Sequence, residues 1–295
     1  EKAYEFTNSV NKIYDVLKTK KIDAVLVIGD RIEAYAAALA SHFCKIPIIH
    51  SGGGTITAGG VDNIYRYHIT YLATIHLADS LKHYNRIVQL EGINKENVHF
   101  VGSVAVDAIF EFQKNPVSIT NVFPQIQKCG FALMTFHPVT LIKEPIPELM
   151  NICIKEIIDN GYDVIVTYPN NDEGHEDIIK IIEKWADHKN LFVSKSLGAQ
   201  RYYSALHDCA FVIGNSSSAL IEAPYFRKTV LNVGTRQHGR DKDVGVREVS
   251  ADPVSVVKEV SEGFQQGWHA CECNCLYGNG DSVEKRREAI LRSFT

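Results

Sequence analysis

Short apolar runs alternate with helical segments along the whole chain, and this alternation restricts the fold more than any other feature. Residues 22–28 and 46–50 have the composition of buried strands, and residues 32–43 between them have the spacing of a helix. Buried strands separated by helices predict a parallel sheet with helices on both faces. The alternation restarts at residue 131 after a connecting segment, which predicts a second doubly wound sheet.

The 295 residues are enough for two α/β domains. We expect a first domain over residues 1–115, a second over residues 116–281, and a closing amphipathic helix over residues 282–295. A doubly wound domain usually opens with a strand, whereas this chain opens with a helical segment and reaches its first strand only at Ile22. We therefore expect the first domain to lack its N-terminal strands.

Charge and hydropathy exclude several classes of partner. The formal net charge is -4 and no run of five or more like charges occurs. The sequence therefore has no basic segment of the kind that binds nucleic acid or an anionic membrane. No apolar stretch approaches the roughly 18 residues of a membrane span, and the amino terminus is unlike a signal peptide. We expect a cytoplasmic protein that acts on a small molecule.

The chain has seven cysteines, an odd number that does not suggest a disulfide framework, and we expect them to be reduced. Cys271, Cys273 and Cys275 form an unusual C-x-C-x-C run. A zinc site normally needs C-x2-C pairs and a second cluster of ligands, which the sequence does not offer. We interpret the three as surface or edge-strand thiols and predict no metal site and no cofactor.

Polar residues follow five of the predicted strands. Ligands of open α/β sheets bind beyond the carboxyl ends of the strands, so these positions are the first candidates for a site. Any one of them could be an ordinary cap or turn, but five together predict a cleft between two domains. The five positions are Asp30-Arg31, His50, His137, Asn170 and the run Asn215 to Ser218.

The run GNSSSALIEA predicts a phosphate site, because a strand, a glycine turn and small hydroxylated residues open a helix whose free N–H groups can hold phosphate oxygens. Glu222 in the same run could accept hydrogen bonds from ribose hydroxyls, or be a surface residue. His137 could donate to a diphosphate, or be structural. Arg236 could neutralise the same diphosphate, or lie in a solvated loop.

Eight strings of the sequence together resemble the hydrolysing UDP-N-acetylglucosamine 2-epimerases. HPVT and GTRQHGR look like the hydrolysing branch, because the other branch typically carries HRREN-like and TERPE-like strings there. The resemblance covers nearly the whole chain and implies two Rossmann-like domains in a GT-B-like arrangement. No GTR-like opening precedes Asp30, which agrees with a first domain that lacks its first strands. The strings are GDRIEA, IIHSGGG, VDNIYRYHIT, HPVT, YPNNDEGH, GNSSSALIEA, GTRQHGR and YGNGD.

The resemblance also implies a reaction, in which the C2 proton is removed, UDP is lost and water adds to release the 2-epimeric amino sugar. It implies that Asp30, Asp62 and His50 are catalytic and that Arg31 and Arg66 lie beside the sugar. The residues implied on the nucleotide side are His137, Asn170, Ser216, Ser217, Glu222 and Arg236, with the backbone of residues 192–196 beside the base.

One position departs from the family pattern. The family has an acidic residue two positions after the histidine, whereas His50 is followed by Ser51 and Gly52. Asp30 and Asp62 could suffice, Glu33 could substitute, or the sugar nucleotide could be a different one. Glu33 could equally be an ordinary acidic residue in the first turn of a helix.

The leading hypothesis from the sequence is therefore a hydrolysing 2-epimerase acting on UDP-N-acetylglucosamine or a related UDP-diacetamido-trideoxyhexose. Two alternatives remain open at this stage, a GT-B glycosyltransferase that uses a UDP-sugar and a catalytically impaired UDP-sugar-binding relic. The expected partner is a UDP-sugar, with no nucleic acid and no membrane. We expect a homo-oligomer, either a dimer or a tetramer.

Overall fold

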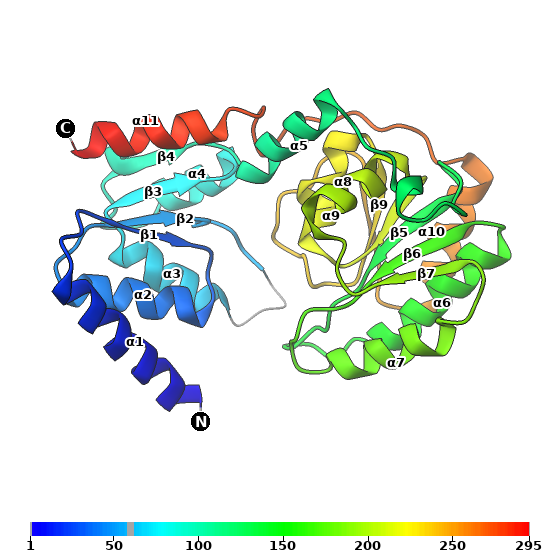
Figure 1. The fold of residues 1–295 in the computed structure, drawn as a ribbon, viewed down its shortest axis with the longest axis horizontal. Coiled ribbons are helices and arrows are strands. Elements are labelled where there is room, and N and C mark those ends of the chain that lie inside the picture. The colour runs from blue at the N-terminus through cyan, green and yellow to red at the C-terminus, as the bar shows by residue number, and fades with distance from the viewer. Residues whose placement is uncertain (1, 58–61, 295) are drawn as a thin grey trace. The chain divides into compact units, whose positions relative to one another are not determined.

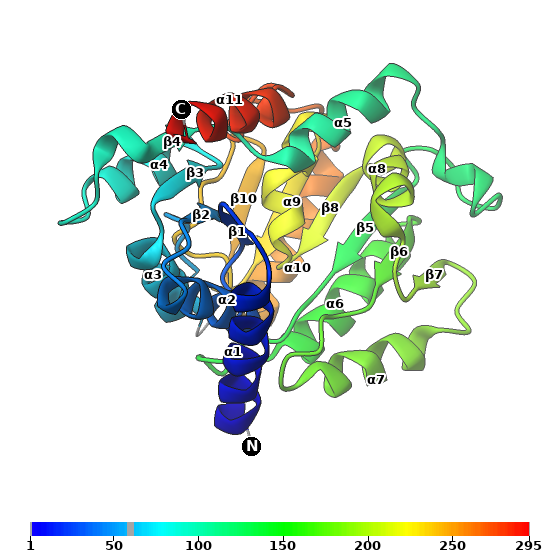
Figure 2. The same cartoon turned by 60° about the vertical axis from the view of Figure 1, so that its left-hand side comes forward.

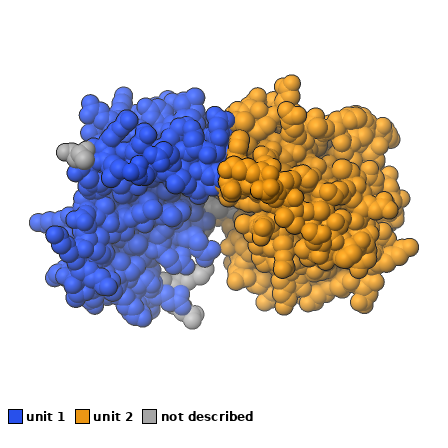
Figure 3. Space-filling model, turned by 45° about the horizontal axis from the view of Figure 1, so that its top comes forward, with its two compact units in different colours: residues 1–57, 61–107, 277–295 blue, residues 58–60, 108–276 orange. Residues whose placement is uncertain are grey.

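The computed structural model describes residues 2–57 and 62–294. They form two compact units, which Figure 3 shows in different colours. Of the described residues, the first unit holds 2–57, 62–107 and 277–294, and the second holds 108–276. The closing helix thus belongs to the first unit. The domain boundaries expected from the sequence stay a proposal.

The first unit is built on a four-stranded parallel sheet in the order β1-β2-β3-β4 (Figure 1). Its strands alternate in sequence with helices and a short 3-10 turn, as the apolar pattern predicts. The elements are α1 (Lys2–Thr19), β1 (Val25–Ile28), α2 (Ile32–Phe43), β2 (Ile48–Ser51), α3 (Asp62–Leu72), β3 (Ile75–Ala78), α4 (Leu81–Val88), η1 (Lys95–Asn97), β4 (Val98–Phe100), the start of α5 (Val104–Lys114) and α11 (Ser282–Phe294).

The two central strands, β2 and β3, are buried on both faces, where neighbouring residues of a strand point to opposite sides. Ile48 packs with Ala38 of α2 and Ile69 of α3. Its neighbour Ile49 packs on the other side, in a cluster that includes Ala289 of α11. The central strands are therefore enclosed on both faces, whereas the edge strand β1 exposes Leu26 and Ile28.

The C-terminal helix α11 is attached to the first unit by Arg286, whose side chain is 13% exposed. The guanidinium donates to the hydroxyl of Ser51 at 2.6 Å, to the carboxylate of Asp79 at 2.6 Å and to the carbonyl oxygen of Gly102 at 2.8 Å. Residues from three distant parts of the chain thus meet on one side chain. The sequence predicted an amphipathic closing helix, either on the surface or as a domain clasp, and did not reveal that this arginine is buried.

Replacing Arg286 with leucine is expected to destabilise the first unit by about 3 kcal/mol, because a largely buried cation and its hydrogen bonds are lost. Urea unfolding followed by circular dichroism measures this. Tryptophan fluorescence would report only on the second unit, which contains both tryptophans, Trp185 and Trp268. Arg287→Leu is the matched control, because Arg287 is 64% exposed and its pair with Glu284 is worth at most about 0.5 kcal/mol. Equal effects of the two substitutions would contradict the assignment.

The second unit is built on a six-stranded parallel sheet in the order β10-β9-β8-β5-β6-β7. In Figures 1 and 2, α6, α7 and α10 cover one face and α8 and α9 lie on the other. The elements are η2 (Ile119–Asn121), β5 (Phe131–Thr135), α6 (Ile146–Asp159), β6 (Asp163–Thr167), α7 (His175–Trp185), β7 (Leu191–Ser194), α8 (Gly198–Asp208), β8 (Phe211–Gly214), α9 (Ser217–Ile221), η3 (Ala223–Phe226), β9 (Thr229–Val233), β10 (Val246–Val249) and α10 (Pro253–Gln266).

The second parallel sheet that the apolar pattern predicts from residue 131 onward is confirmed, but its edge strand β10 was not predicted. Its two central residues, Arg247 and Glu248, are charged and exposed, so it has no apolar run. The strand order reverses between β5 and β8, the topological switch point where ligands of such sheets bind. No helix of the described chain combines the length and the apolar character needed to span a membrane.

Candidate functional site

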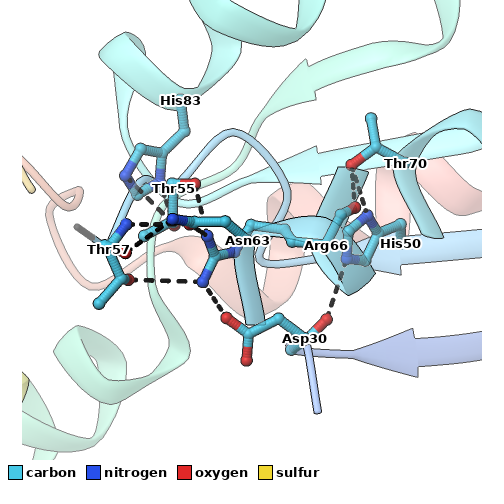
Figure 4. Close-up of polar contacts among 9 residues, drawn as sticks. Asp30, His50, Thr55, Thr57, Asn63, Arg66, Thr70 and His83 are labelled. Atoms are coloured by element: carbon cyan, nitrogen blue, oxygen red, sulfur yellow. Dashed lines mark hydrogen bonds and ion pairs between the residues drawn. The ribbon is translucent and has the colours of Figure 1, made fainter. Parts of the chain in front are cut away.

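A buried arginine gathers polar groups at the carboxyl ends of the strands in the first unit (Figure 4). Arg66 of α3 is 2% exposed and forms an ion pair with Asp30, which follows β1. Its guanidinium also donates to the side chain of Asn63, to the carbonyl oxygen of Thr55 at 2.8 Å and to the hydroxyl of Thr57 at 3.5 Å. Asp30 and Arg66 are two of the predicted site residues, and the structure brings them together.

His50, near the end of β2, is fully buried behind this pair. Its Nε2 lies 3.1 Å from the carbonyl oxygen of Gly29, and its Nδ1 lies 3.2 Å from the hydroxyl of Thr70. Burial lowers the pKa of His50 to about 4, so the ring is neutral at pH 7. A carbonyl oxygen can only accept, so Nε2 carries the proton. His50 therefore holds the turn that carries Asp30, while its predicted catalytic role stays a prediction.

The remaining sugar-side candidates lie on two helix starts. Asp62 is the first residue of α3, one turn before Arg66, so the two share a helix face. Arg31 is 74% exposed and pairs with the exposed Glu33 at 3.3 Å. A hydrogen bond from its own backbone N–H and the nearby Arg31 lower the pKa of Glu33. Glu33 is thus in the first turn of α2, as the simpler of the two sequence interpretations expects.

The glycine loop after His50 explains why no carboxylate follows it. Gly52 and Gly54 have φ angles of +98° and +76°, in the left-handed region that favours glycine. A Cβ at Gly54 would collide with the backbone of His83, and one at Gly53 would lie 3.1 Å from Nδ1 of His50. At Gly52, where the family has its carboxylate, a Cβ would make only ordinary contacts with Gly29, so the positive φ is what favours glycine there.

The second unit contains a polar pocket of about 350 Å³ at the carboxyl ends of β5, β6 and β8, beside the switch point. Strand ends, the β7–α8 loop and the starts of two helices form its walls. The lining residues are Thr135, His137, Thr167, Tyr168, Lys195, Ser196, Leu197, Gly198, Ala199, Tyr202, Tyr203, Ser216, Ser218 and Glu222. Of the predicted residues, His137, Ser216 and Glu222 line this pocket.

The orientation of His137 is set by backbone and side-chain hydrogen bonds. The backbone N–H of Asn170 donates to Nδ1 of His137 at 3.0 Å, and the Asn215 side chain bonds both backbone groups of His137, at 2.7 and 2.9 Å. Burial, and to a lesser extent Arg236, lower the pKa of His137 to about 4. A neutral ring that accepts at Nδ1 carries its proton on Nε2. His137 is therefore a fixed hydrogen-bond donor.

Three hydroxyl groups form a chain on the opposite wall. The Tyr202 hydroxyl lies 2.9 Å from that of Ser218, which lies 2.9 Å from that of Ser216. Burial raises the pKa of the nearby Glu222 carboxyl to about 7. Ser218 lies in the serine run that the sequence singled out, whereas sequence reasoning missed Tyr202, because nothing in the sequence distinguished it from other helical tyrosines.

Three of the residues predicted on the nucleotide side do not line this pocket, namely Asn170, Ser217 and Arg236. The Asn170 amide donates to the carboxylate of Asp172, and Nη2 of Arg236 lies 4.0 Å from the same carboxylate. Arg236 also donates to the carbonyl oxygen of Asn215 at 3.3 Å. Asn170 and Arg236 thus both lie beside Asp172. Each also contacts the surroundings of His137, because Asn170 donates to its ring and Arg236 donates to Asn215, whose side chain bonds its backbone.

The loop that carries Arg236 is fixed by a glutamate that sequence reasoning also missed. The Glu144 carboxylate accepts from the backbone N–H of Thr235 at 2.8 Å and from its hydroxyl at 2.6 Å.

Gly214, which directly precedes the serine run, has a φ of +142°, and a Cβ there would collide with the carbonyl oxygen of Thr135. The glycine turn is therefore a packing requirement of the β5–β8 contact.

Metal ligands do not cluster in the part of the chain that the structure describes. Among residues 2–57 and 62–294, no group of three or more histidine, cysteine, aspartate or glutamate side chains could hold a metal ion. The polar side-chain groups of the pocket are hydroxyls, a neutral imidazole, the ammonium group of Lys195 and a carboxylate.

A doubly wound α/β chain with a polar pocket at its switch point belongs to the nucleotide-binding class of such folds. More narrowly, the chain belongs to the UDP-N-acetylglucosamine 2-epimerase family, whose model matches residues 2–291. It is thus an enzyme of that family.

Solved structures confirm the predicted fold class, two Rossmann-like α/β domains of the GT-B-like kind. The Staphylococcus aureus structure described as the S. aureus MnaA-UDP co-structure matches with a TM-score of 0.83 and 20% identity, over 98% of this chain and 79% of that one. A Neisseria meningitidis UDP-GlcNAc 2-epimerase bound to UDP-GlcNAc matches with a TM-score of 0.82 and 19% identity, over 97% and 81% of the two chains.

Curated relatives are similar over most of the chain. A Legionella pneumophila UDP-N,N'-diacetylbacillosamine 2-epimerase (hydrolyzing) is 28% identical over 92% of this chain and 71% of its own length. A Campylobacter jejuni GDP/UDP-N,N'-diacetylbacillosamine 2-epimerase (hydrolyzing) is 30% identical over 77% of this chain and 60% of its own. Polysialic acid biosynthesis protein P7 of Escherichia coli is 28% identical over 85% and 65%. The chain thus spans 60% to 71% of the length of these relatives.

Proposed function

We propose that this protein is a hydrolysing 2-epimerase of UDP-N-acetylglucosamine or a related UDP-diacetamido-trideoxyhexose. The observation that carries the proposal is the switch-point pocket, in which a neutral histidine donor, serine hydroxyls and a carboxylate surround a volume of about 350 Å³. Two relatives named as hydrolysing epimerases of a diacetamido sugar nucleotide support the hydrolysing type. We further propose that it works in the cytoplasm as a homo-oligomer, a dimer or a tetramer.

In this proposal the second unit holds UDP. Nε2 of His137 and the hydroxyl of Ser216 donate to the diphosphate, and Arg236 adds positive charge beside it. Glu222 accepts hydrogen bonds from the ribose hydroxyls. The base lies against residues 195–199, which form one wall of the pocket.

The reaction needs proton transfers at C2 and at the attacking water, and the departure of UDP. The Asp30 carboxylate, held by Arg66, removes the C2 proton, and the electron pair forms the C1–C2 double bond as the C1–O bond to UDP breaks. Water then bonds through its oxygen to C1 while the protonated carboxyl of Asp62 gives its proton to C2 on the opposite face. The proton that the water loses returns to Asp62, and Asp30 releases its proton to solvent. His137, Ser216 and Arg236 stabilise the negative charge on the leaving diphosphate.

A turnover assay in deuterated water, followed by NMR, tests the reaction. Incubation of the protein with UDP-N-acetylglucosamine is expected to release UDP and free N-acetylmannosamine that carries deuterium at C2, and a parallel assay with a UDP-diacetamido-trideoxyhexose identifies the better sugar. Deuterated sugar that stays attached to UDP would identify the non-hydrolysing reaction. Absence of both UDP release and deuterium with either sugar nucleotide would refute the proposal.

A second candidate, the UDP-sugar-binding relic, is favoured by one observation, the left-handed backbone of Gly52, which favours glycine at the position where the family has its carboxylate. Calorimetry separates it from the enzyme. The relic binds UDP without turnover of either sugar nucleotide, and Asp30→Asn changes nothing that it does.

The raised pKa of Glu222 predicts that the affinity for uridine depends on pH. Burial raises this pKa to about 7, so the carboxyl is largely protonated at pH 6 and ionised at pH 8. Hydrogen bonds to an ionised acceptor are stronger, so we expect uridine affinity to rise by roughly tenfold over this interval. The affinity is measured by calorimetry with uridine, because uridine lacks the diphosphate, whose own titration would also change the affinity.

Glu222→Gln removes the titrating group and is expected to bind uridine roughly tenfold more weakly at pH 8, with no rise between pH 6 and pH 8. Glu183→Gln is the control, because Glu183 is exposed on α7 and should retain the full rise. A rise that persists in Glu222→Gln would show that another group causes the pH dependence.

A further inference from the structure

The proposed function does not use the three alternating cysteines that follow α10. In the structure they do not behave alike. The Sγ atoms of Cys273 and Cys275 lie 3.8 Å apart. Cys271 is held separately, since its Sγ lies 3.3 Å from the hydroxyl of Thr229 and its backbone N–H donates to the carbonyl oxygen of Arg227 at 3.0 Å. The run therefore contains one thiol pair and one separate thiol.

The backbone between the paired cysteines is held in a tight turn. Cys275 has a φ of +53°, and its N–H donates to Sγ of Cys273 at 3.4 Å. The carboxylate of the buried Asp243 accepts from the backbone N–H of Asn274 at 3.0 and 2.9 Å, and Sγ of Cys273 lies 3.7 Å from it. These bonds keep the two sulfur atoms facing each other.

Both thiols are half-buried, so a small oxidant can reach them. A disulfide needs an S–S distance of about 2.05 Å, and rotation of the two short side chains closes the remaining gap. Burial raises the pKa of Cys273 to about 12, so Cys273 is a neutral thiol at pH 7. The Asp243 carboxylate, 3.7 Å from Sγ of Cys273, also disfavours negative charge on that sulfur, so we assign the first attack on the oxidant to Cys275.

We propose that Cys273 and Cys275 form a reversible intramolecular disulfide with hydrogen peroxide as the oxidant. The Cys275 thiolate attacks one peroxide oxygen, the O–O bond breaks, and a sulfenic acid and hydroxide form. The Cys273 sulfur then attacks Sγ of Cys275, the S–S bond forms, the S–O bond breaks, and the departing hydroxide takes the Cys273 proton as water. Two thiols give two electrons to the peroxide, which becomes two waters.

The test uses the intact native protein and one tryptic peptide. The segment from residue 259 to residue 285 ends at a lysine, has no internal lysine or arginine, and contains all three cysteines. After peroxide treatment, alkylation under denaturing conditions and digestion, we expect one alkylated cysteine, Cys271, and the loss of two hydrogen atoms. Dithiothreitol before alkylation should restore three alkylated cysteines. Fragmentation of the wild-type peptide locates the bond without any variant.

Cys271→Ser is the matched control and is expected to keep the disulfide, whereas Cys273→Ser and Cys275→Ser are expected to lose it. Three alkylated cysteines after peroxide, a disulfide that includes Cys271, or oxygen addition without loss of hydrogen would each overturn the proposal. No sugar nucleotide takes part, so the result is independent of the proposed epimerase function.

Discussion

Asparagine in place of Asp30 is expected to lower the turnover of UDP-N-acetylglucosamine by roughly 10²–10⁴-fold, because an amide cannot accept the C2 proton. The amide oxygen can still accept from Arg66, so the turn should keep its structure. UDP binding should not change, since the pocket proposed for UDP lies in the second unit. The prediction therefore separates chemistry from binding.

The rate of UDP release by NMR and the affinity for UDP by calorimetry are the two measurements. Asp23→Asn is the matched control, because Asp23 is exposed just before β1 and should retain full activity. Unchanged turnover in Asp30→Asn would remove Asp30 from the mechanism. A loss of UDP affinity equal to the loss of turnover would indicate a structural effect.

Acid is expected to destabilise the first unit strongly, because two neighbouring strands bury neutral histidines. His50 of β2 and His76 of β3 are register partners, and burial lowers the pKa of each from 6.5 to about 4. Between these values the unfolded chain binds protons that the folded chain does not, so stability is fully present above about pH 6.5 and falls as the pH approaches 4. Each histidine contributes up to about 1.4 kcal/mol per pH unit.

The loss should therefore reach roughly 5 kcal/mol for the two histidines together by pH 4. Urea unfolding at pH 7, 6 and 5, followed by circular dichroism, measures it. His76→Leu should remove about half of the acid effect and cost little at pH 7, because Nδ1 of His76 has no hydrogen-bond partner among the described residues. His42→Gln, at an exposed position of α2, should leave the pH dependence unchanged. An unaltered slope in His76→Leu would contradict the assignment.

Apolar periodicity was sufficient to predict most of the fold. Strands such as β5 and β8 are buried on both faces, so their sequences are continuous apolar runs that have no other stable environment in water. The edge strand β10 escaped prediction because an edge strand can keep charged residues such as Arg247 and Glu248 in solvent.

The candidate site was predicted less evenly. His137 and Ser216 follow buried strands, and the topology alone brings such positions to the same sheet edge. Tyr202 reaches the pocket from α8, and Glu144 reaches the Arg236 loop from a segment 91 residues earlier. Local sequence does not contain the information that selects these two side chains, because their neighbours come from distant parts of the chain.

By itself, the sequence determined the alternation of strands and helices, the family and the strand-end positions where polar groups gather, because each depends on short-range pattern. Only the tertiary structure decided that His50 is fully enclosed and that Arg286 holds α11 to the first unit. The physical reason is that burial and hydrogen-bond partners depend on contacts between residues that are 20 to 235 positions apart in the chain.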